Sequence, residues 1–193
     1  MYHPHSQLIL ASGSPRRRDL LTRSGYVFDV EPADVDETRL TDELPSDYVL
    51  RLARLKADTV CSGPEDGRFV LAADTIVVLD NDVLGKPQGR DDAVMMLRRL
   101  SGRTHEVLTG VALVRGGARC SGMAKTEVTL VDLDDQTIAM YVATGESFDK
   151  AGAYGIQGLA SRFVDRINGS YTNVVGLPMV LVERLMRKLD ESV

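Results

Sequence analysis

A single carboxylate interrupts the most apolar stretch of the chain. Residues 69–79 read FVLAADTIVVL, and a run of this length and composition predicts a long central strand. Asp74 lies in the middle of that run, where an unpaired charge would be strongly destabilising. It therefore needs a cation, a hydrogen-bond network or a metal ion. Facing a cleft, such a carboxylate can position a metal ion or accept a proton from water; otherwise it is a structural aspartate satisfied by backbone amides.

The rest of the chain alternates between strand and helix patterns. Hydrophobic periodicity and turn residues predict strands at 7–11, 26–30, 107–114 and 126–131, and helices from Pro15 to Gly25, from Ser46 to Ser62, from Asp91 to the residue before Gly102, from Asp134 or Asp135 to Gly145, and from Pro178 through Leu189. Hairpins are expected at residues 80–82 and 116–117. The predicted fold is therefore α/β (mixed α+β) with a mixed sheet, and residues 1–193 are expected to form one folding unit.

The composition restricts the class of protein and its location. Hydrophobic residues make up 44% and charged residues 26% of the chain, which is typical of a globular protein. No apolar run approaches the roughly 20 residues that span a bilayer, and residues 1–7 lack the parts of a signal peptide, so we expect a cytosolic protein with no membrane partner. The net charge of -5 argues against a nucleic-acid binder, although a local positive cluster can still attract a small anion. Cys61 and Cys120 lack metal-ligand spacing and are expected to be reduced structural thiols.

Three consecutive arginines stand at the start of the first predicted helix. Arg16, Arg17 and Arg18 follow the residues Ser12-Gly13-Ser14-Pro15, and the helix dipole already presents partial positive charge at this end. The arrangement becomes favourable when an anion docks there, because backbone N–H groups and guanidinium groups together bind phosphate or carboxylate. The alternative is a solvated basic helix end. The segment does not have the GxxxxGK[ST] pattern of a Walker A loop.

Charged residues in two further segments allow two interpretations each. Lys56 comes seven residues after Val49 and continues the apolar face of the helix from Ser46; it is either a lysine that extends to solvent from the rim of the core or a functional lysine. Asp34, Asp36 and Glu37 form an acidic loop. Their hard oxygen ligands suit magnesium or manganese, although most acidic loops are only solvated.

Two loops have compositions that suit a binding site without proving one. Lys86 stands between Gly85 and Pro87, and residues 149–158 read DKAGAYGIQG. Glycine-rich segments allow a backbone to approach a ligand closely, yet flexible loops share this composition.

Taken together and in this order, these segments resemble the Maf family, nucleotide pyrophosphatases first linked to septum formation. The resemblance covers almost the whole chain and rests on LILASGSPRRRDLL (8–21), VDE (35–37), LARLKA (52–57), AADTIVVLDNDVLGKP (72–87), MLRRLSGRTHEVLTGVAL (96–113), DKAGAYGIQG (149–158) and INGSYTNVVGLP (167–178). It implies a fold like that of the inosine triphosphate pyrophosphatases, with a twisted mixed sheet, flanking helices and a deep cleft between two lobes. It also implies a homodimer and a divalent cation, with magnesium and manganese as the first candidates and cobalt as a further one.

The resemblance implies a role for each matching residue. Asp74 matches the family's proton acceptor, and Glu37 matches an acidic residue near the metal ion. Polar and cationic groups that face the triphosphate are matched at four positions: Ser14, Arg17, Lys56 and Lys86. The implied reaction is that of a nucleotide diphosphatase, which cuts a nucleoside triphosphate to the monophosphate and pyrophosphate.

Three positions resemble the subgroup of the family that acts on dTTP and UTP. They are Arg16 after SGSP, Thr75 in ADT and Gln157 in YGIQG. A sister subgroup that prefers 7-methyl-GTP tends to carry a bulky aromatic residue, DQ and SEG at these places. The resemblance therefore implies pyrimidine substrates, with CTP and modified pyrimidine nucleotides as further candidates. Asp19 stands where glutamate is usual, which affects no residue assigned to catalysis.

A second class of function is compatible with the same residues. A nucleotide-binding regulator of cell division or septum formation would also bind nucleotides but would not turn them over. The presence of both Glu37 and Asp74 favours the enzyme, because a sensor has no need of a base beside a metal ion.

Overall fold

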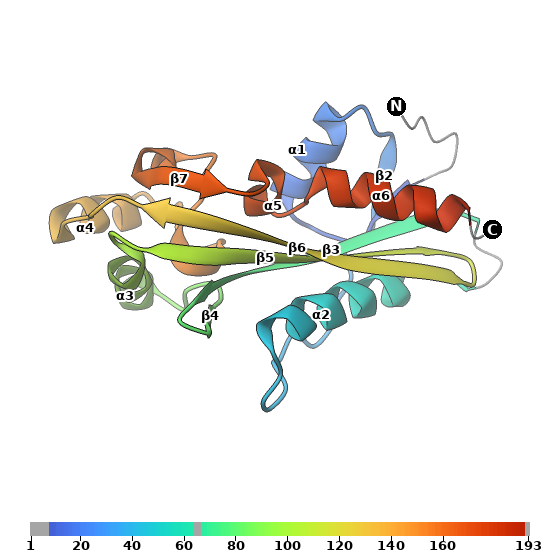
Figure 1. Cartoon of the computed structure of the whole chain (residues 1–193), viewed down its shortest axis with the longest axis horizontal. Helices are drawn as coiled ribbons and strands as arrows, with labels where there is room; N and C mark the ends of the chain where they lie inside the picture. The colour runs from blue at the N-terminus through green and yellow to red at the C-terminus, as the bar shows by residue number, and fades with distance from the viewer. Residues whose placement is uncertain (1–7, 64–66, 192–193) are drawn as a thin grey trace. The chain divides into compact units, whose positions relative to one another are not determined.

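The computed structural model describes residues 8–63 and 67–191. The described residues form a seven-stranded mixed sheet flanked by helices (Figure 1), which confirms the predicted mixed α/β class. The chain divides into two compact units, one made of Met1–Asp74, Thr109–Ala124 and Gly176–Val193, and the other of Thr75–Leu108 and Lys125–Val175. The cleft between lobes and the single folding unit expected above stay predictions.

Three long strands contribute residues to both units, and the other elements belong to one unit each. The long strands are β3 (Phe69–Leu79), β5 (Thr104–Arg115) and β6 (Ala118–Leu130). The first unit adds β1 (Leu8–Leu10), α1 (Pro15–Arg23), β2 (Phe28–Val30), α2 (Pro45–Val60) and α6 (Met179–Asp190). The second adds β4 (Asp82–Leu84), α3 (Arg90–Leu100), α4 (Asp135–Ala143), the 3-10 helices η1 (Ala151–Ala153) and η2 (Leu159–Phe163), β7 (Val164–Asn168) and α5 (Tyr171–Val175).

The strand order explains why the sheet is mixed. The hydrogen-bonded order is β2-β1-β3-β5-β6-β7, with β4 paired to β3. β1 pairs in parallel with both β2 and β3, whereas β4 pairs with β3 and β7 with β6 in antiparallel fashion. The β3–β4 connection is a tight turn in which Asp80 and Asn81 both have positive φ, the backbone that such two-residue hairpin turns require.

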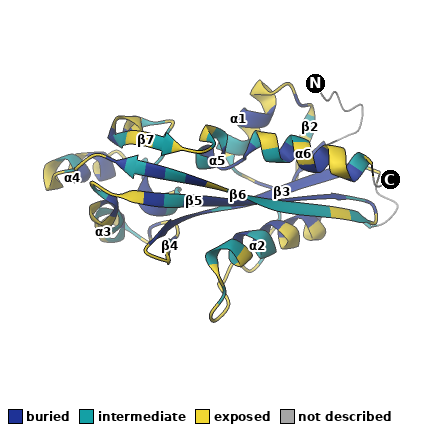
Figure 2. Ribbon diagram, in the orientation of Figure 1, coloured by how far each residue is buried: buried dark blue, intermediate teal, exposed yellow. Residues whose placement is uncertain are grey.

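In the first unit, helix α2 covers one face of the strands and α1 and α6 lie on the other (Figure 1). Alternate residues of a strand point to opposite faces, and one set of alternate residues meets α2 in an apolar cluster: Ile9, Ala11, Ala53, Ala57, Val60, Val70, Ala72, Ala112 and Val114. Figure 2 shows the strands of this layer largely buried. Many of these residues are alanines, so the helix and the strands approach closely.

In the second unit, the core gathers side chains of α3, α4 and η2 around the ends of the long strands. Its buried members include Leu97, Leu100, Ile138, Tyr141 and Phe163. The rings of Tyr141 and Phe163 meet edge to face with centroids 5.2 Å apart, a favoured aromatic geometry.

Several predicted elements are confirmed and others need correction. The bounds of β3, the start of α1 at Pro15 and the N-cap Asp134, whose carboxylate accepts a 2.7 Å hydrogen bond from Thr137 N, are as predicted. Ser46 and Asp91 do not cap their helices: α2 begins at Pro45 and α3 at Arg90. Proline at the first helical position explains the earlier start of α2, because its fixed φ suits a helix.

Several strands and short helices were predicted too short or missed. β5 extends beyond 107–114 at both ends, whereas β6 begins well before 126 and ends at Leu130. The strand after the expected hairpin at 80–82, β4, was given no bounds, and β7, α5 and both 3-10 helices were not predicted. Short elements and polar strand ends carry little periodic signal, and their pairing with distant strands decides their structure.

The described part of the chain contains no helix that is both long and apolar enough to cross a membrane. The prediction that residues 1–7 lack a signal peptide concerns residues outside the described ranges. Cys61 and Cys120 are both free thiols, as predicted.

A glycine of β5 sets how closely α2 approaches the sheet. A Cβ atom at Gly110 would stand 2.5 Å from the carbonyl carbon of Val49 and 2.9 Å from Leu50 N, both backbone atoms of α2. We predict that Gly110→Ala lowers the free energy of unfolding by about 2–3 kcal/mol, since the helix must move away from the strand. Urea denaturation measures this change. The control is Gly117→Ala, in the turn after the same strand, where an added Cβ atom would have no other atom within 4 Å. This substitution should change the free energy of unfolding by less than about 0.5 kcal/mol. An equal effect of both substitutions would contradict the contact between Gly110 and α2.

Candidate active site

Asp74 lies buried in β3 and has a cationic partner. The Nζ atom of Lys56, in α2, donates a 2.7 Å hydrogen bond to Asp74 Oδ1, and both residues are only 8% exposed. This confirms that the carboxylate in the apolar strand needs a partner, and among the alternatives left open by the sequence the partner is a cation. The position of Lys56 on the buried face of α2 is confirmed as well.

The same ammonium group also binds Glu37. Lys56 Nζ lies 2.6 Å from Glu37 Oε1, and the side chain of Glu37 is 55% exposed. Lys56 is therefore placed between a buried carboxylate and a solvent-exposed one. An ammonium group has three N–H donors, and since Asp74 and Glu37 accept two of them, one is left for a further acceptor.

Arg17 is held rigidly beside Asp74. Its Nε donates a 2.8 Å hydrogen bond to the carbonyl of Gly176, and its Nη1 donates to Ser12 Oγ at 3.0 Å and to the Ala73 carbonyl at 2.7 Å. Burial lowers the pKa of Arg17, and the nearby Asp74 carboxylate opposes this shift, so the guanidinium remains charged. The first helix therefore brings the positive charge of Arg17 next to Asp74.

The other predicted residues of helix α1 lie at its first turn. Ser14 is the N-cap residue of α1, and its N–H donates to Ser12 Oγ at 3.3 Å. Arg16 is half-buried, whereas Arg18 is exposed. The first turn contains no acidic residue, so its basic side chains and helix dipole produce a positive potential next to Asp74.

Three predicted site residues belong to the second unit. Thr75 follows Asp74 in β3 and is half-buried, while Lys86 and Gln157 are exposed. The loop that carries Lys86 is joined to η1, which precedes Gln157 in the chain, by a 3.0 Å hydrogen bond from Gly152 N to the Gly85 carbonyl. That these three residues face the substrate stays a prediction.

The residues that hold the Glu37 loop were not predicted from the sequence. Tyr48 donates a 2.7 Å hydrogen bond to the Glu37 carbonyl, and Arg51 binds both carboxylate oxygens of Glu43 at 2.6 and 2.9 Å and the Thr38 carbonyl at 3.1 Å. Burial and the Asp74 and Glu37 carboxylates raise the pKa of Tyr48. Arg51 thereby connects α2 to the loop that carries Glu37. Its spacing from Glu43 follows no local helical rule, so no sequence pattern could have indicated the pair.

The acidic side chains around Lys56 suit a cation that binds together with a phosphate ligand. Within residues 8–63 and 67–191, no three His, Cys, Asp or Glu side chains are grouped to hold a metal ion. Glu37 and Asp74, however, share one ammonium at 2.6 and 2.7 Å. Magnesium is commonly bound through one or two carboxylates, with waters and substrate phosphates completing the shell. These residues therefore fit such a cation, but not a cage made of protein ligands alone.

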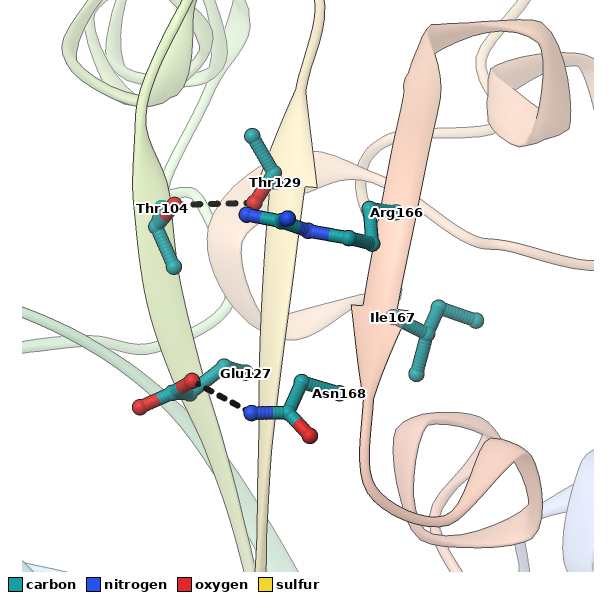
Figure 3. Close-up of a pocket in the computed structure, with 6 residues that line it drawn as sticks. All are labelled: Thr104, Glu127, Thr129, Arg166, Ile167 and Asn168. Atoms are coloured by element: carbon teal, nitrogen blue, oxygen red, sulfur yellow. Dashed lines mark hydrogen bonds between the residues drawn. The ribbon is translucent and has the colours of Figure 1, made fainter.

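A separate pocket of ≈ 350 Å³ lies over β5, β6 and β7 (Figure 3). It is lined by Thr104, Glu127, Thr129, Arg166, Ile167 and Asn168. Two pairs of these side chains are hydrogen-bonded to one another, Thr104 with Thr129 at 2.8 Å and Asn168 with Glu127 at 3.0 Å. The pocket contains none of the predicted site residues, so it is not the candidate active site.

A buried histidine supports the glycine-rich loop. His105 Nε2 lies 2.7 Å from the Tyr154 hydroxyl, and the rings meet edge to face with centroids 5.4 Å apart. The Nδ1 atom is buried and has no hydrogen-bond partner among the described residues. Burial lowers the pKa of His105 from 6.5 to about 4, so the ring is neutral in the folded protein at neutral pH.

The Lys56–Asp74 pair should be important for stability. We predict that Lys56→Met lowers the free energy of unfolding by about 3 kcal/mol, because it leaves a buried carboxylate without a partner. Adding Asp74→Asn to this variant should restore part of the loss. Urea denaturation measures both changes. The control is Lys125→Met, which removes an exposed pair with Glu106 and should cost less than about 1 kcal/mol; similar losses in the two single variants would contradict the role of the buried pair.

The pKa of His105 predicts how stability depends on pH. Between pH 6.5 and 4 the unfolded chain binds a proton at this position and the folded chain does not, so the free energy of unfolding falls as the pH is lowered through this window. From pH 7 to pH 5 the contribution is about 2 kcal/mol. His105→Gln should remove it, giving a flatter dependence of the denaturation midpoint on pH. Parallel curves for the two proteins would show that His105 titrates normally in the folded state.

Comparison with known proteins identifies the family of this chain. A protein from Anaeromyxobacter dehalogenans (strain 2CP-C) named dTTP/UTP pyrophosphatase is 52% identical over 186 residues, which cover 94% of this chain and 93% of the relative. Proteins of the same name from Koribacter versatilis (52% identical; 94% and 93% covered) and Geotalea uraniireducens (47% identical; 98% of both chains) are similarly related. A solved dITP/XTP pyrophosphatase from Mycobacterium abscessus is 17% identical with a TM-score of 0.43, covering 64% of this chain and 74% of that one, too distant to support any conclusion. A family model described as "Maf-like protein" matches residues 7–189, and because this match spans nearly the whole sequence, the chain belongs to the Maf-like protein family.

Proposed function

We propose that this chain is a nucleotide diphosphatase that hydrolyses dTTP and UTP to the monophosphate and pyrophosphate. The relatives that bear the name dTTP/UTP pyrophosphatase align with it over almost its full length. The observation that carries the proposal is the buried Asp74 carboxylate, bound by Lys56 and placed next to the rigid guanidinium of Arg17. A base between two fixed cations suits attack by water on a phosphoric anhydride.

In the proposed reaction, Asp74 accepts the proton of a water molecule whose oxygen attacks the α-phosphorus. The bond from that phosphorus to the bridging oxygen breaks, and its electron pair leaves with pyrophosphate. Lys56 has one N–H donor beyond those bound to Asp74 and Glu37, and it donates this to a phosphate oxygen. Arg17 and Lys86 neutralise negative charge of the phosphates, and Ser14 donates a hydrogen bond to them. Together these groups stabilise the charge that develops on the leaving group.

Glu37 is the residue that would hold a divalent cation, while Asp74 acts as the base. Magnesium, manganese or cobalt, when bound, would neutralise phosphate oxygens. Tyr48 and Arg51 keep the Glu37 loop in place. Glu37 therefore does not have to be ordered when the cation binds.

Substrate selection is assigned to residues that take no part in bond breaking. Arg16, Thr75 and Gln157 are proposed to contact the base or the sugar and to favour pyrimidine nucleotides, including CTP and modified pyrimidines as further substrates. A homodimer, implied by the family resemblance, and a cytosolic location, expected from the sequence, complete the proposal.

Replacing Asp74 tests the proposed base. We predict that Asp74→Asn keeps the fold and nucleotide binding but lowers kcat for dTTP by about 10²–10⁴-fold, since general-base catalysis contributes that much. The measurement is pyrophosphate release with magnesium or manganese and a panel of nucleotides. Asp58→Asn, an exposed residue of α2 paired with Arg119, is the matched control and should keep its turnover.

Isotope labelling separates the proposed route from others. In H₂¹⁸O the label should appear in the monophosphate, because water attacks the α-phosphorus, and label in pyrophosphate or free phosphate would exclude this route. Retained turnover in Asp74→Asn would remove Asp74 from the role of base. Binding of nucleotides by the wild type without any release of pyrophosphate would favour the non-catalytic regulator.

A further inference from the structure

The predicted selectivity residue Gln157 stands in a tight turn with glycine at both ends. The turn runs from Gly155 to Gly158 and is closed by a 3.1 Å hydrogen bond from Gly158 N to the Gly155 carbonyl. The side chain of Gln157 is exposed, and within the described residues it makes no hydrogen bond. Its amide is therefore available to a ligand, and its position depends entirely on how the turn is held.

Glu146 holds the end of the turn that follows Gln157. Its carboxylate accepts a 2.9 Å hydrogen bond from Leu159 N through Oε2 and a 3.1 Å hydrogen bond from the Tyr141 hydroxyl through Oε1. A Cβ atom at Gly158 would stand 2.5 Å from Glu146 Oε2, so the carboxylate lies directly against the turn backbone. Only glycine leaves room for it there.

Lys150 supports the other end of the turn and is tied to Glu146. A Cβ atom at Gly155 would stand 2.6 Å from Lys150 Cδ, so the aliphatic part of this lysine packs against the turn. The Nζ atom donates 2.6 Å hydrogen bonds to the Glu146 carbonyl and to Asp149 Oδ1. Both supports of the turn are therefore joined at Glu146.

The tyrosine that donates to Glu146 is itself fixed. Tyr141 is fully buried in α4, and its ring packs edge to face against Phe163 in η2. Its hydroxyl therefore holds the Glu146 carboxylate from a rigid part of the second unit. A carboxylate clamped between a core tyrosine and a backbone N–H is more than a solvated surface charge, since charge-assisted hydrogen bonds of this kind are among the stronger ones.

We propose that Glu146 is a positioning residue for Gln157, and that the preference of the protein for pyrimidine nucleotides depends on its carboxylate. The proposal rests on the proposed function, because it assigns Gln157 to substrate selection. Glu146 touches no reacting atom. It fixes the turn so that the Gln157 amide is presented without a cost of ordering when the nucleotide binds.

The test compares Glu146→Gln, Gln157→Ala and the double variant with dTTP and dGTP as substrates. Glu146→Gln keeps the size of the side chain, but its amide has only one acceptor oxygen for two donors. We expect KM for dTTP to rise about 5- to 10-fold, as for the loss of one hydrogen bond of ordinary strength. The value of kcat should change little, and the preference for dTTP over dGTP should fall by a similar factor. The double variant should be no worse than Gln157→Ala alone, because the two residues act through one contact.

Two further variants keep the result interpretable. Tyr141→Phe removes one donor to Glu146 and retains the ring contact with Phe163. It should change the preference for dTTP over dGTP in the same direction as Glu146→Gln but by a smaller factor. It takes the place of Glu146→Gln if that variant does not fold. Asp135→Asn, an exposed residue at the start of the same helix paired with Arg98, is the control and should leave both KM values unchanged.

The outcomes separate this proposal from the proposed function. Equal losses for dTTP and dGTP, or independent effects of Glu146→Gln and Gln157→Ala that multiply in the double variant, would overturn the positioning role. If the wild type shows no turnover, the same comparison is made by calorimetric titration of dTTP and dGTP on the wild type and on the variants. Weaker and less selective binding after Glu146→Gln would then support the positioning role even though the enzyme proposal had failed, and unchanged affinities would refute it.

Discussion

The ion pair between Lys56 and Asp74 is the interaction on which this structure depends. A carboxylate in the middle of an apolar strand is tolerated only when its charge is compensated, and here the compensating group comes from a helix that packs on the same strand. The pair therefore fixes the register of α2 against β3 as well as the state of the carboxylate. Since Lys56 also binds Glu37, one lysine connects the core of the first unit with an exposed acidic loop.

The first unit shows how an acidic protein can offer a site to a polyanion. The chain carries a net charge of -5, yet the first turn of α1 has arginines and no acidic residue. Arg17 cannot turn away to neutralise other groups, because two backbone carbonyls and a serine hydroxyl hold it. Local placement of a few fixed charges thus decides the potential at the site, whatever the total charge.

The sequence predicted the parts of this molecule that have a strong local signal. The apolar run around Asp74, the proline at the start of α1 and the buried face of α2 each follow from periodicity or from one residue's backbone preference. Three interactions could not be predicted in this way. They are the ion pair of Asp74 with its partner, the ion pair of Arg51 with Glu43, and the contact of the Glu146 carboxylate with the turn that carries Gln157. Each joins residues that are far apart or irregularly spaced along the chain, and folding alone brings them together. Family resemblance supplied the roles of Glu37, Lys86 and Gln157, which composition and spacing left open.

The contact between Gly110 and α2 has a consequence for how the site tolerates change over evolution. Backbone meets backbone there, so no adjustable side chain sets the distance between helix and sheet. Val49 is two helical turns from Lys56, about 10 Å along the axis. The fixed position of the Val49 backbone therefore also determines where the Lys56 side chain starts and how far its ammonium group extends. Conservative exchanges among the aliphatic residues of the core can accumulate by drift without moving α2 relative to β5. Gly110 itself has little freedom to vary.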